Sequence, residues 1–125
     1  MTLILDAGAL MAYEHGDRTV RAFLERASRT GVDVRTTSGV VAQVWRDGAR
    51  QARLALLLRG LLEVELTRER ARRVGTLLGQ ACQRDVVDGS VVDAAADGDE
   101  ILTTDPDDIT TLARHSRRQL IVTKV

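Results

Sequence analysis

Short apolar runs alternate with longer amphipathic segments along this chain, which is the pattern of an α/β protein. The apolar runs are short, and the strands predicted around them are five residues long, as expected for buried strands. In Leu62–Leu66, leucine and valine alternate with Glu63 and Glu65, which predicts an edge strand with one solvated face. The five predicted strands are Thr2–Asp6, Val32–Thr36, Leu62–Leu66, Glu100–Thr104 and Gln119–Thr123.

The segments between the strands carry apolar residues at helical spacing. In Arg18–Arg29 they recur every three or four positions, with Asp17 placed to cap the helix and Gly31 to end it. Within the helix that opens at Thr67, Gly75 and Gly79 predict close helix packing. The predicted helices are Ala7–Glu14, Arg18–Arg29, one carrying Val40 to Trp45 and capped by Thr37 or Ser38, one from after Gly48 to Gly60, Thr67–Cys82, Val87–Ala96 and Pro106–His115. This order predicts a single α/β domain, with a mainly parallel five-stranded sheet covered by helices on both faces.

Four aspartates fall where such a sheet would gather them. Asp6 ends the first strand, Asp88 follows the Asp85-Val86-Val87 step, and Asp105 and Asp108 follow the strand that ends at Thr104. Ligands of open α/β sheets bind outside the carboxyl ends of the strands. Oxygen ligands crowded at that edge are typical of Mg²⁺ or Mn²⁺ sites. The arrangement therefore predicts a metal site suited to phosphodiester hydrolysis.

Each of these aspartates also has a purely structural explanation. Asp105 before Pro106 is a good helix cap, and acids in a first turn suit the helix dipole. Asp6 and the pair Asp85 and Asp88 are placed to cap helices as well. Four like charges at one edge would nevertheless destabilise each other, and a divalent cation would remove that cost.

Composition narrows the choice of function. The one cysteine, Cys82, excludes an internal disulfide and a multi-cysteine zinc site, and it fits a reducing, cytoplasmic location. Neither a signal peptide nor a membrane span is expected. Net charge is zero, but nine acids and no basic residue lie between Asp85 and Asp108. The arginine-rich remainder could hold a polyanion, unless arginine is only a compositional habit of the source genome.

Four segments together resemble PIN-domain proteins of the VapC toxin type, over nearly the whole chain. The segments are Leu3–Leu10, Val40–Arg46, Asp85–Val92 and Leu102–Asp108. The resemblance implies one PIN domain over residues 1–125, with a Rossmann-like five-stranded sheet. It also implies an acidic pocket that binds Mg²⁺ or Mn²⁺, endoribonuclease activity, an antitoxin whose C-terminal segment occupies the pocket, and a homodimer.

The resemblance assigns roles to individual residues. Asp6, Asp88 and Asp105 would hold the metal, and Asp108 would be a supporting ligand or position the water. Supporting roles fall to Gln43, Asp85, Ser38 and Thr104, and the RNA phosphates are expected on Arg46, Arg50 or Arg53.

One position departs from the family pattern. The second acid of the family is usually a glutamate, and Gln43 stands there, so the site loses one negative charge unless Glu14 reaches it. A PIN fold that binds RNA or a protein without cleaving is therefore the alternative function. A phosphate-accepting signalling domain is a third hypothesis, although no aspartate follows Leu62–Leu66. The leucines between Leu54 and Leu62 indicate either an apolar groove for a partner or plain core packing.

Overall fold

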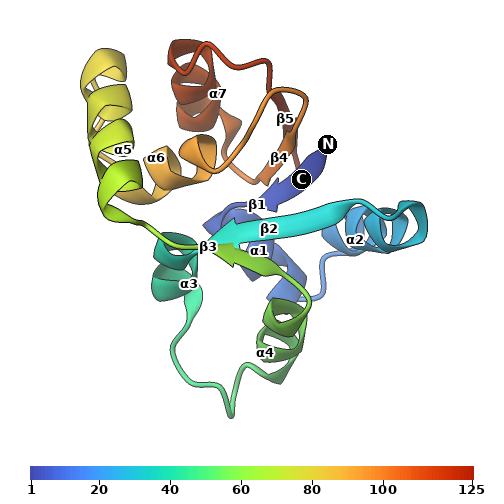
Figure 1. Ribbon diagram of the computed structural model, residues 1–125. Coiled ribbons are helices and arrows are strands. Elements are labelled where there is room, and N and C mark those ends of the chain that lie inside the picture. The colour runs from blue at the N-terminus through green and yellow to red at the C-terminus, as the bar shows by residue number, and fades with distance from the viewer.

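The computed structural model describes all 125 residues and contains one parallel sheet of five strands. The strand order is β3-β2-β1-β4-β5, and every neighbouring pair is parallel (Figure 1). From β1 the chain first builds outward through β2 to β3, and then returns to the other side of β1 to add β4 and β5. The direction of winding therefore reverses between β1 and β4, which is the topological switch point where such sheets bind ligands. The strands are β1 Thr2–Leu5, β2 Asp33–Thr37, β3 Leu62–Val64, β4 Glu100–Thr103 and β5 Ile121–Lys124.

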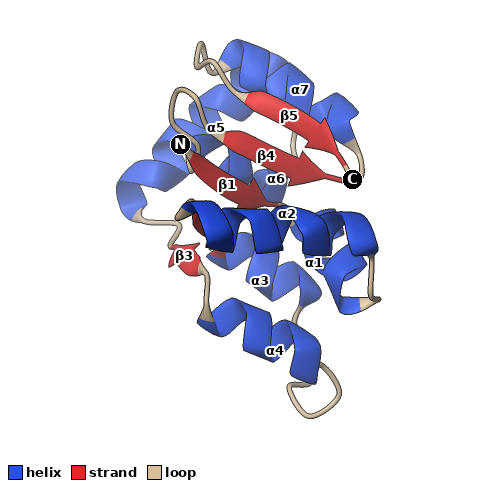
Figure 2. Cartoon of the chain, turned by 90° about the vertical axis from the view of Figure 1, so that its right-hand side faces the viewer, coloured by secondary structure: helices blue, strands red, loops and turns tan.

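Seven helices connect the strands in the predicted order. Helices α5, α6 and α7 pack on one another on one face of the sheet, while α1 contacts α2, α3 and α4 on the other (Figures 1 and 2). The two groups follow from the right-handed crossovers of parallel sheets, because the chain winds in opposite directions on the two sides of β1. The helices are α1 Ala7–Glu14, α2 Arg18–Thr30, α3 Ser38–Val44, α4 Ala52–Arg59, α5 Arg68–Ala81, α6 Val86–Asp93 and α7 Pro106–His115.

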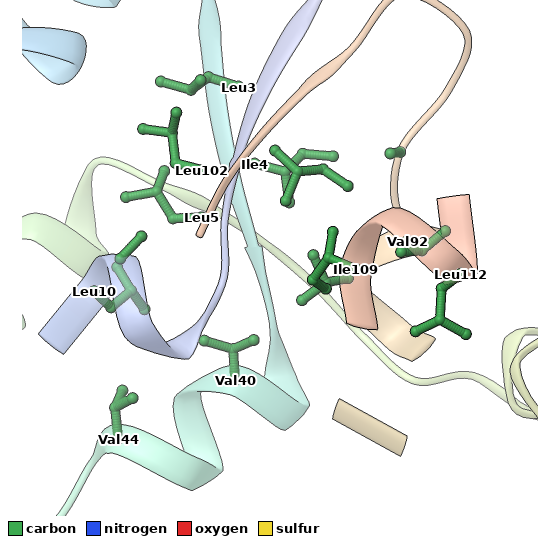
Figure 3. Close-up of a cluster of buried hydrophobic side chains, with 14 of the residues drawn as sticks. Leu3, Ile4, Leu5, Leu10, Val40, Val44, Val92, Leu102, Ile109 and Leu112 are labelled. Carbon is green, nitrogen blue, oxygen red and sulfur yellow. The ribbon is translucent and has the colours of Figure 1, made fainter. Parts of the chain in front are cut away.

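The core lies on both sides of the two central strands. Ile4 and Leu5 in β1 and Ile101 and Leu102 in β4 are fully buried, and Leu10, Val40 and Ile109 close over them (Figure 3). Each such side chain contributes about 1.5–3 kcal/mol by burial. The outer strands contribute less burial energy, because every residue of β3 and β5 is exposed or only partly buried. For β3 this agrees with the edge strand predicted at Leu62–Leu66. Four boundaries differ from prediction by two residues or more: α4 begins at Ala52, β3 ends at Val64, α6 ends at Asp93 and β5 begins at Ile121.

The prediction of close helix packing at Gly75 and Gly79 is wrong. A Cβ added at either residue would meet nothing within 4 Å. The close approach is instead at Gly89 in α6, where an added Cβ would lie 2.8 Å from Val74 Cγ1 and 3.3 Å from Leu78 in α5. Gly75 and Gly79 therefore lie on the open surface of α5. The close contact between α5 and α6 instead requires a residue without a side chain at position 89.

The leucines of the α4 region are mainly core residues. Leu54 is fully buried, and Leu57, Leu58 and Leu61 pack against the core. Leu56 and Leu62 remain exposed. Of the two interpretations of this segment, core packing accounts for most of it. No helix is long and apolar enough to cross a membrane.

Candidate active site

Asp6 stands at the switch point, directly after β1. Its backbone N–H donates to Leu102 O in β4 at 3.2 Å, and its Oδ1 accepts from Ala9 N at 2.8 Å as the cap of α1. The side chain is buried, and this burial raises the pKa of the Asp6 carboxyl, with a smaller contribution from the charge of Asp105. Hydrogen bonds from Thr103 and from the amides of Gly8 and Ala9 partly offset the rise. Asp6 therefore caps α1, but its carboxylate is poorly solvated and lies near the negative charge of Asp105.

Asp88 lies in the first turn of α6 and is the most perturbed carboxylate of the edge. Asp85 caps that helix by accepting from Val87 N at 2.9 Å and from Asp88 N at 3.0 Å, whereas the Asp88 carboxylate makes no hydrogen bond. Desolvation, together with smaller contributions from the charges of neighbouring acids, raises the pKa of Asp88 to about 6; those acids are Asp85, Asp6, Asp108 and Asp105. Five carboxylates therefore share one electrostatic environment, as the strand-end pattern predicts. We call this group, which is Asp6, Asp85, Asp88, Asp105 and Asp108, the acidic edge.

Asp105 and Asp108 complete this group from the start of α7. Asp105 occupies the cap position without making a capping hydrogen bond, because its backbone groups, and not its carboxylate, bond to Thr103 Oγ1. At Asp108 only the carbonyl oxygen has a partner, Gln83 Nε2 at 3.5 Å. Both side chains are exposed, and no ion pair of the structure involves any acid of this edge.

The capping explanation therefore holds for part of the set only. It accounts for the side chains of Asp6 and Asp85, which make capping bonds. It does not account for Asp88, Asp105 and Asp108, whose carboxylates have no hydrogen-bond partner in the protein. Unpaired carboxylates that raise the pKa of a neighbour destabilise the fold, so capping alone does not explain them.

The donor set fits a hard cation in chemistry and in charge, but it is not a closed cage. Every candidate ligand is a carboxylate oxygen, yet no three acidic, histidine or cysteine side chains stand close enough together to hold a metal ion. Mg²⁺ usually keeps several waters and takes one or two carboxylates plus substrate phosphates. A site with Asp6 and Asp88 as ligands, and water at the remaining positions, satisfies that requirement.

The residues predicted to support the site are spread more widely. Thr104 lies over the first turn of α1, where a Cβ on Gly8 would overlap its hydroxyl. Ser38 is the half-buried first residue of α3 and makes no side-chain hydrogen bond. Gln43 is exposed, also without such a bond, in the last turn of α3, about 7.5 Å along the helix axis from Ser38. Glu14 does not replace the missing acid, because its carboxylate faces Gln51 Nε2 at 3.4 Å.

The three arginines expected to bind RNA lie in the loop after α3 and at the start of α4. Arg46 and Arg50 lie in the loop between α3 and α4, where Arg46 donates to Ala42 O and Trp45 O. Arg53 donates to Glu14 O at the last residue of α1, so it lies at the opposite end of that helix from Asp6. The expected contacts of these arginines with RNA phosphates stay a prediction.

Sequence reasoning missed a pair of hydroxyls beside the site. Thr37 Oγ1 and Ser90 Oγ are 3.0 Å apart and buried, and Ser90 Oγ donates to Val87 O at 2.7 Å. Thr37 Oγ1 also accepts from Val40 N, so the pair ties the start of α3 to the helix that carries Asp88. The only signal in the sequence is that Ser90 follows Asp88 by two residues, which does not predict a partner in another helix.

The comparison with known proteins rests on structure. No protein-family model matches the sequence, and neither does any curated protein. Among solved structures, the fold matches a chain of VapBC2 from Rickettsia felis bound to a DNA fragment from their promoter, with a TM-score of 0.73 over 99% of this chain and 100% of that one. The fold is PIN-like. At 13% identity the likeness establishes the PIN-like fold, and function must be argued from the site.

Proposed function

We propose that this PIN-like protein is a divalent-metal-dependent endoribonuclease, the toxin of a toxin–antitoxin pair. The observation that carries the proposal is the set of unpaired carboxylates at the β1–β4 switch point, where desolvation and the charges of neighbouring acids together raise the pKa of Asp88 to about 6. The likeness to a chain of a VapBC complex supports the same assignment.

The proposed roles follow from position and burial. Asp6 and Asp88 would hold Mg²⁺ or Mn²⁺ with water at the remaining positions, Asp105 would bind the ion through a water, and Asp108 would orient a water from the exposed side. The bound ion supplies polarisation of the phosphoryl oxygen and activation of a water. Asp85 and the Thr37–Ser90 pair would keep α6 in place, so that the Asp88 carboxylate faces the other acids. Because the pKa of Asp88 is about 6, its carboxylate is mostly ionised at neutral pH and available to a cation.

The proposed partners match the charge of the site. An antitoxin segment that carries a basic side chain would complement the acidic edge, and opposite potentials favour rapid association. The RNA substrate would bring its phosphate to the same edge through the metal. We also propose a homodimer, which light scattering of the purified protein tests, since a monomer mass would contradict it.

The test of the activity is cleavage of total cellular RNA in the presence of Mn²⁺. Wild type should cleave, and Asp6→Asn should lose the activity because the buried ligand becomes neutral. Asp107→Asn is the matched control, since Asp107 is an exposed acid in the first turn of α7 that does not contribute to the pKa of Asp88. Equal cleavage by wild type and Asp6→Asn would contradict the proposal.

A second candidate function is RNA or protein binding without cleavage. It is favoured by Gln43 in place of an acid, and by the absence of three acidic side chains close enough together to hold a metal. The variant Gln43→Glu separates the two functions. A strong gain of cleavage in this variant would show that the natural site is weakened, whereas unchanged cleavage would show that Gln43 belongs to a working site.

A further inference from the structure

We propose that a cavity between α5 and α7, remote from the acidic edge, binds the phosphate backbone of RNA. The cavity has a volume of about 350 Å³, and its polar lining includes Arg72, Arg73 and Gln80 from α5 and His115 and Arg118 from the end of α7 and the turn after it. We call it the arginine cavity. It lies at the C-terminal ends of α6 and α7, whereas the acidic edge lies at their N-terminal ends. Naming RNA as the polyanion rests on the proposed function.

The charge of the arginine cavity is far from balanced. Its one acid is Asp93, the last residue of α6, whose side chain is only 5% exposed. Asp93 Oδ2 lies 3.0 Å from Arg70 Nη1, Asp93 Oδ1 lies 2.9 Å from Arg73 Nε, and Arg118 Nη2 lies 3.9 Å from Oδ1. Three guanidinium groups therefore share one carboxylate, and Arg72, which lines the same cavity, pairs with no acid. The surplus positive charge has no partner in the protein and calls for an external anion.

The arginines are also held in place before any ligand arrives. Arg118 Nη1 donates to the carbonyl oxygens of Val92, Asp93 and Ala95 at the end of α6, at 3.2, 2.9 and 2.7 Å. Arg73 makes a two-pronged contact with Asp93, through Nε at 2.9 Å and Nη2 at 3.2 Å. Each guanidinium carries five N–H donors, so both retain free donors after these bonds. A preorganised fork of this kind binds phosphate at a reduced cost in side-chain entropy.

The extent of the basic surface indicates a repeating anion. Arg68 and Arg70 continue it along α5, and Arg114 and Arg117 continue it around the end of α7. Residues 68–73 include one acid, Glu69, and residues 114–118 include none. A second cavity, of about 690 Å³, adjoins the first and shares Arg118 with it. A row of cations with so few acids matches the regular phosphates of a nucleic-acid backbone better than a single small anion.

Binding of a fluorescently labelled single-stranded RNA tests this proposal, with anisotropy measured over a range of salt concentrations in EDTA so that no cleavage occurs. The test variant is the double change Arg72→Gln, in the arginine cavity, and Arg114→Gln, in the adjoining second cavity, both at exposed side chains that pair with no acid. Each lost phosphate contact should reduce the slope of log K against log salt by about 0.7, which at 0.1 M salt is about fivefold in affinity. The control is Arg29→Gln with Arg59→Gln, which removes the same charge from exposed, unpaired arginines in the last turns of α2 and α4.

The outcomes separate the two proposals. A reduced slope in the test variant and not in the control supports the arginine cavity, even if wild type fails to cleave RNA with Mn²⁺, in which case only the proposed function falls. Equal losses in both double variants would overturn the cavity as a site, because net charge alone would explain them. Weaker binding of a labelled oligoglutamate with unchanged RNA binding would overturn RNA in favour of an acidic protein partner. Circular dichroism spectra that match wild type establish that each variant is folded.

Discussion

Replacing Asp88 by asparagine should make the protein more stable at neutral pH. The substitution keeps the shape of the side chain and removes a charge that the site places beside the charges of Asp85, Asp6, Asp108 and Asp105. Most substitutions destabilise a protein, so a gain at this position would be unusual. It would show that the wild type tolerates electrostatic repulsion at the acidic edge.

The magnitude follows from the pKa of the Asp88 carboxyl, which rises from 3.8 to about 6. At about 1.4 kcal/mol for each pH unit, this rise corresponds to about 3 kcal/mol of unfavourable free energy in the ionised folded state. The side chain is half-exposed, so solvent screening reduces the cost to about 1–2 kcal/mol. Loss of a negative charge from the first turn of α6 costs about 0.3–1 kcal/mol. The expected net gain is about 1 kcal/mol, or about 4 °C in Tm for a chain of this length.

The stabilisation expected from Asp88→Asn depends on pH. Between pH 4 and 6 the folded wild type binds more protons at Asp88 than the unfolded chain does, so its stability falls as pH rises through this window. Below pH 4 the carboxyl is protonated in both states and the cost disappears. The advantage of Asp88→Asn should therefore be complete at pH 7.5 and fall to about a third at pH 4.5.

Urea unfolding in EDTA, followed by circular dichroism at pH 7.5 and 4.5, measures this difference. Asp107→Asn is the control and should give no gain, because Asp107 does not act on Asp88. Mn²⁺ at tenfold its Kd should stabilise wild type by about 1.4 kcal/mol and Asp88→Asn by less. An Asp88→Asn variant that is no more stable than wild type at pH 7.5 would refute the electrostatic reasoning.

Three further predictions concern packing and the buried acid. Gly89→Ala should destabilise the protein by about 1–3 kcal/mol in urea unfolding, because its Cβ would lie 2.8 Å from Val74 Cγ1. Gly75→Ala, where the added Cβ meets nothing within 4 Å, should instead stabilise α5 by up to about 1 kcal/mol, and a loss there would contradict this account of α5. Asp93→Asn should lower the free energy of unfolding by about 2 kcal/mol, because charge-assisted bonds from several arginines are lost; an unchanged Tm would mean that the ion pairs are not formed in solution.

The sequence predicted the fold well because its signals are local and agree with one another. The alternation of short apolar runs with amphipathic segments gave the order of all twelve elements, and the capping residues placed most helix starts within one residue. The errors occur where a local pattern has two meanings. Glycine in a helix indicates either exposed surface or a close contact, and only the packing of α6 on α5 assigns the second meaning to Gly89.

The sequence places the acids of the candidate site at one edge of the sheet, but it does not reveal which other side chains pack around them. Strand ends of a parallel sheet meet at one edge, so the convergence of the acids after β1 and β4 follows from topology. The hydroxyl pair Thr37–Ser90 and the arginine cavity depend on how helices far apart in sequence face one another. Periodicity does not contain that information. The expected RNA contacts of Arg46, Arg50 and Arg53 stay a prediction, since nothing in the sequence fixes the course of the chain after α3.

Aspartate serves three different purposes in this protein, and the distinction between them carries the functional argument. Asp17 is satisfied by a backbone amide as a cap, and Asp99 is buried between the amides of Thr2 and Ala96. Asp93 is neutralised by arginines. The carboxylates of Asp88 and Asp105 have neither kind of partner, although the chain has arginines in number and uses several of them on Asp93. Unlike Asp17, Asp93 and Asp99, these two acids stand at the switch point without a partner, and this supports the proposal of a cation site there.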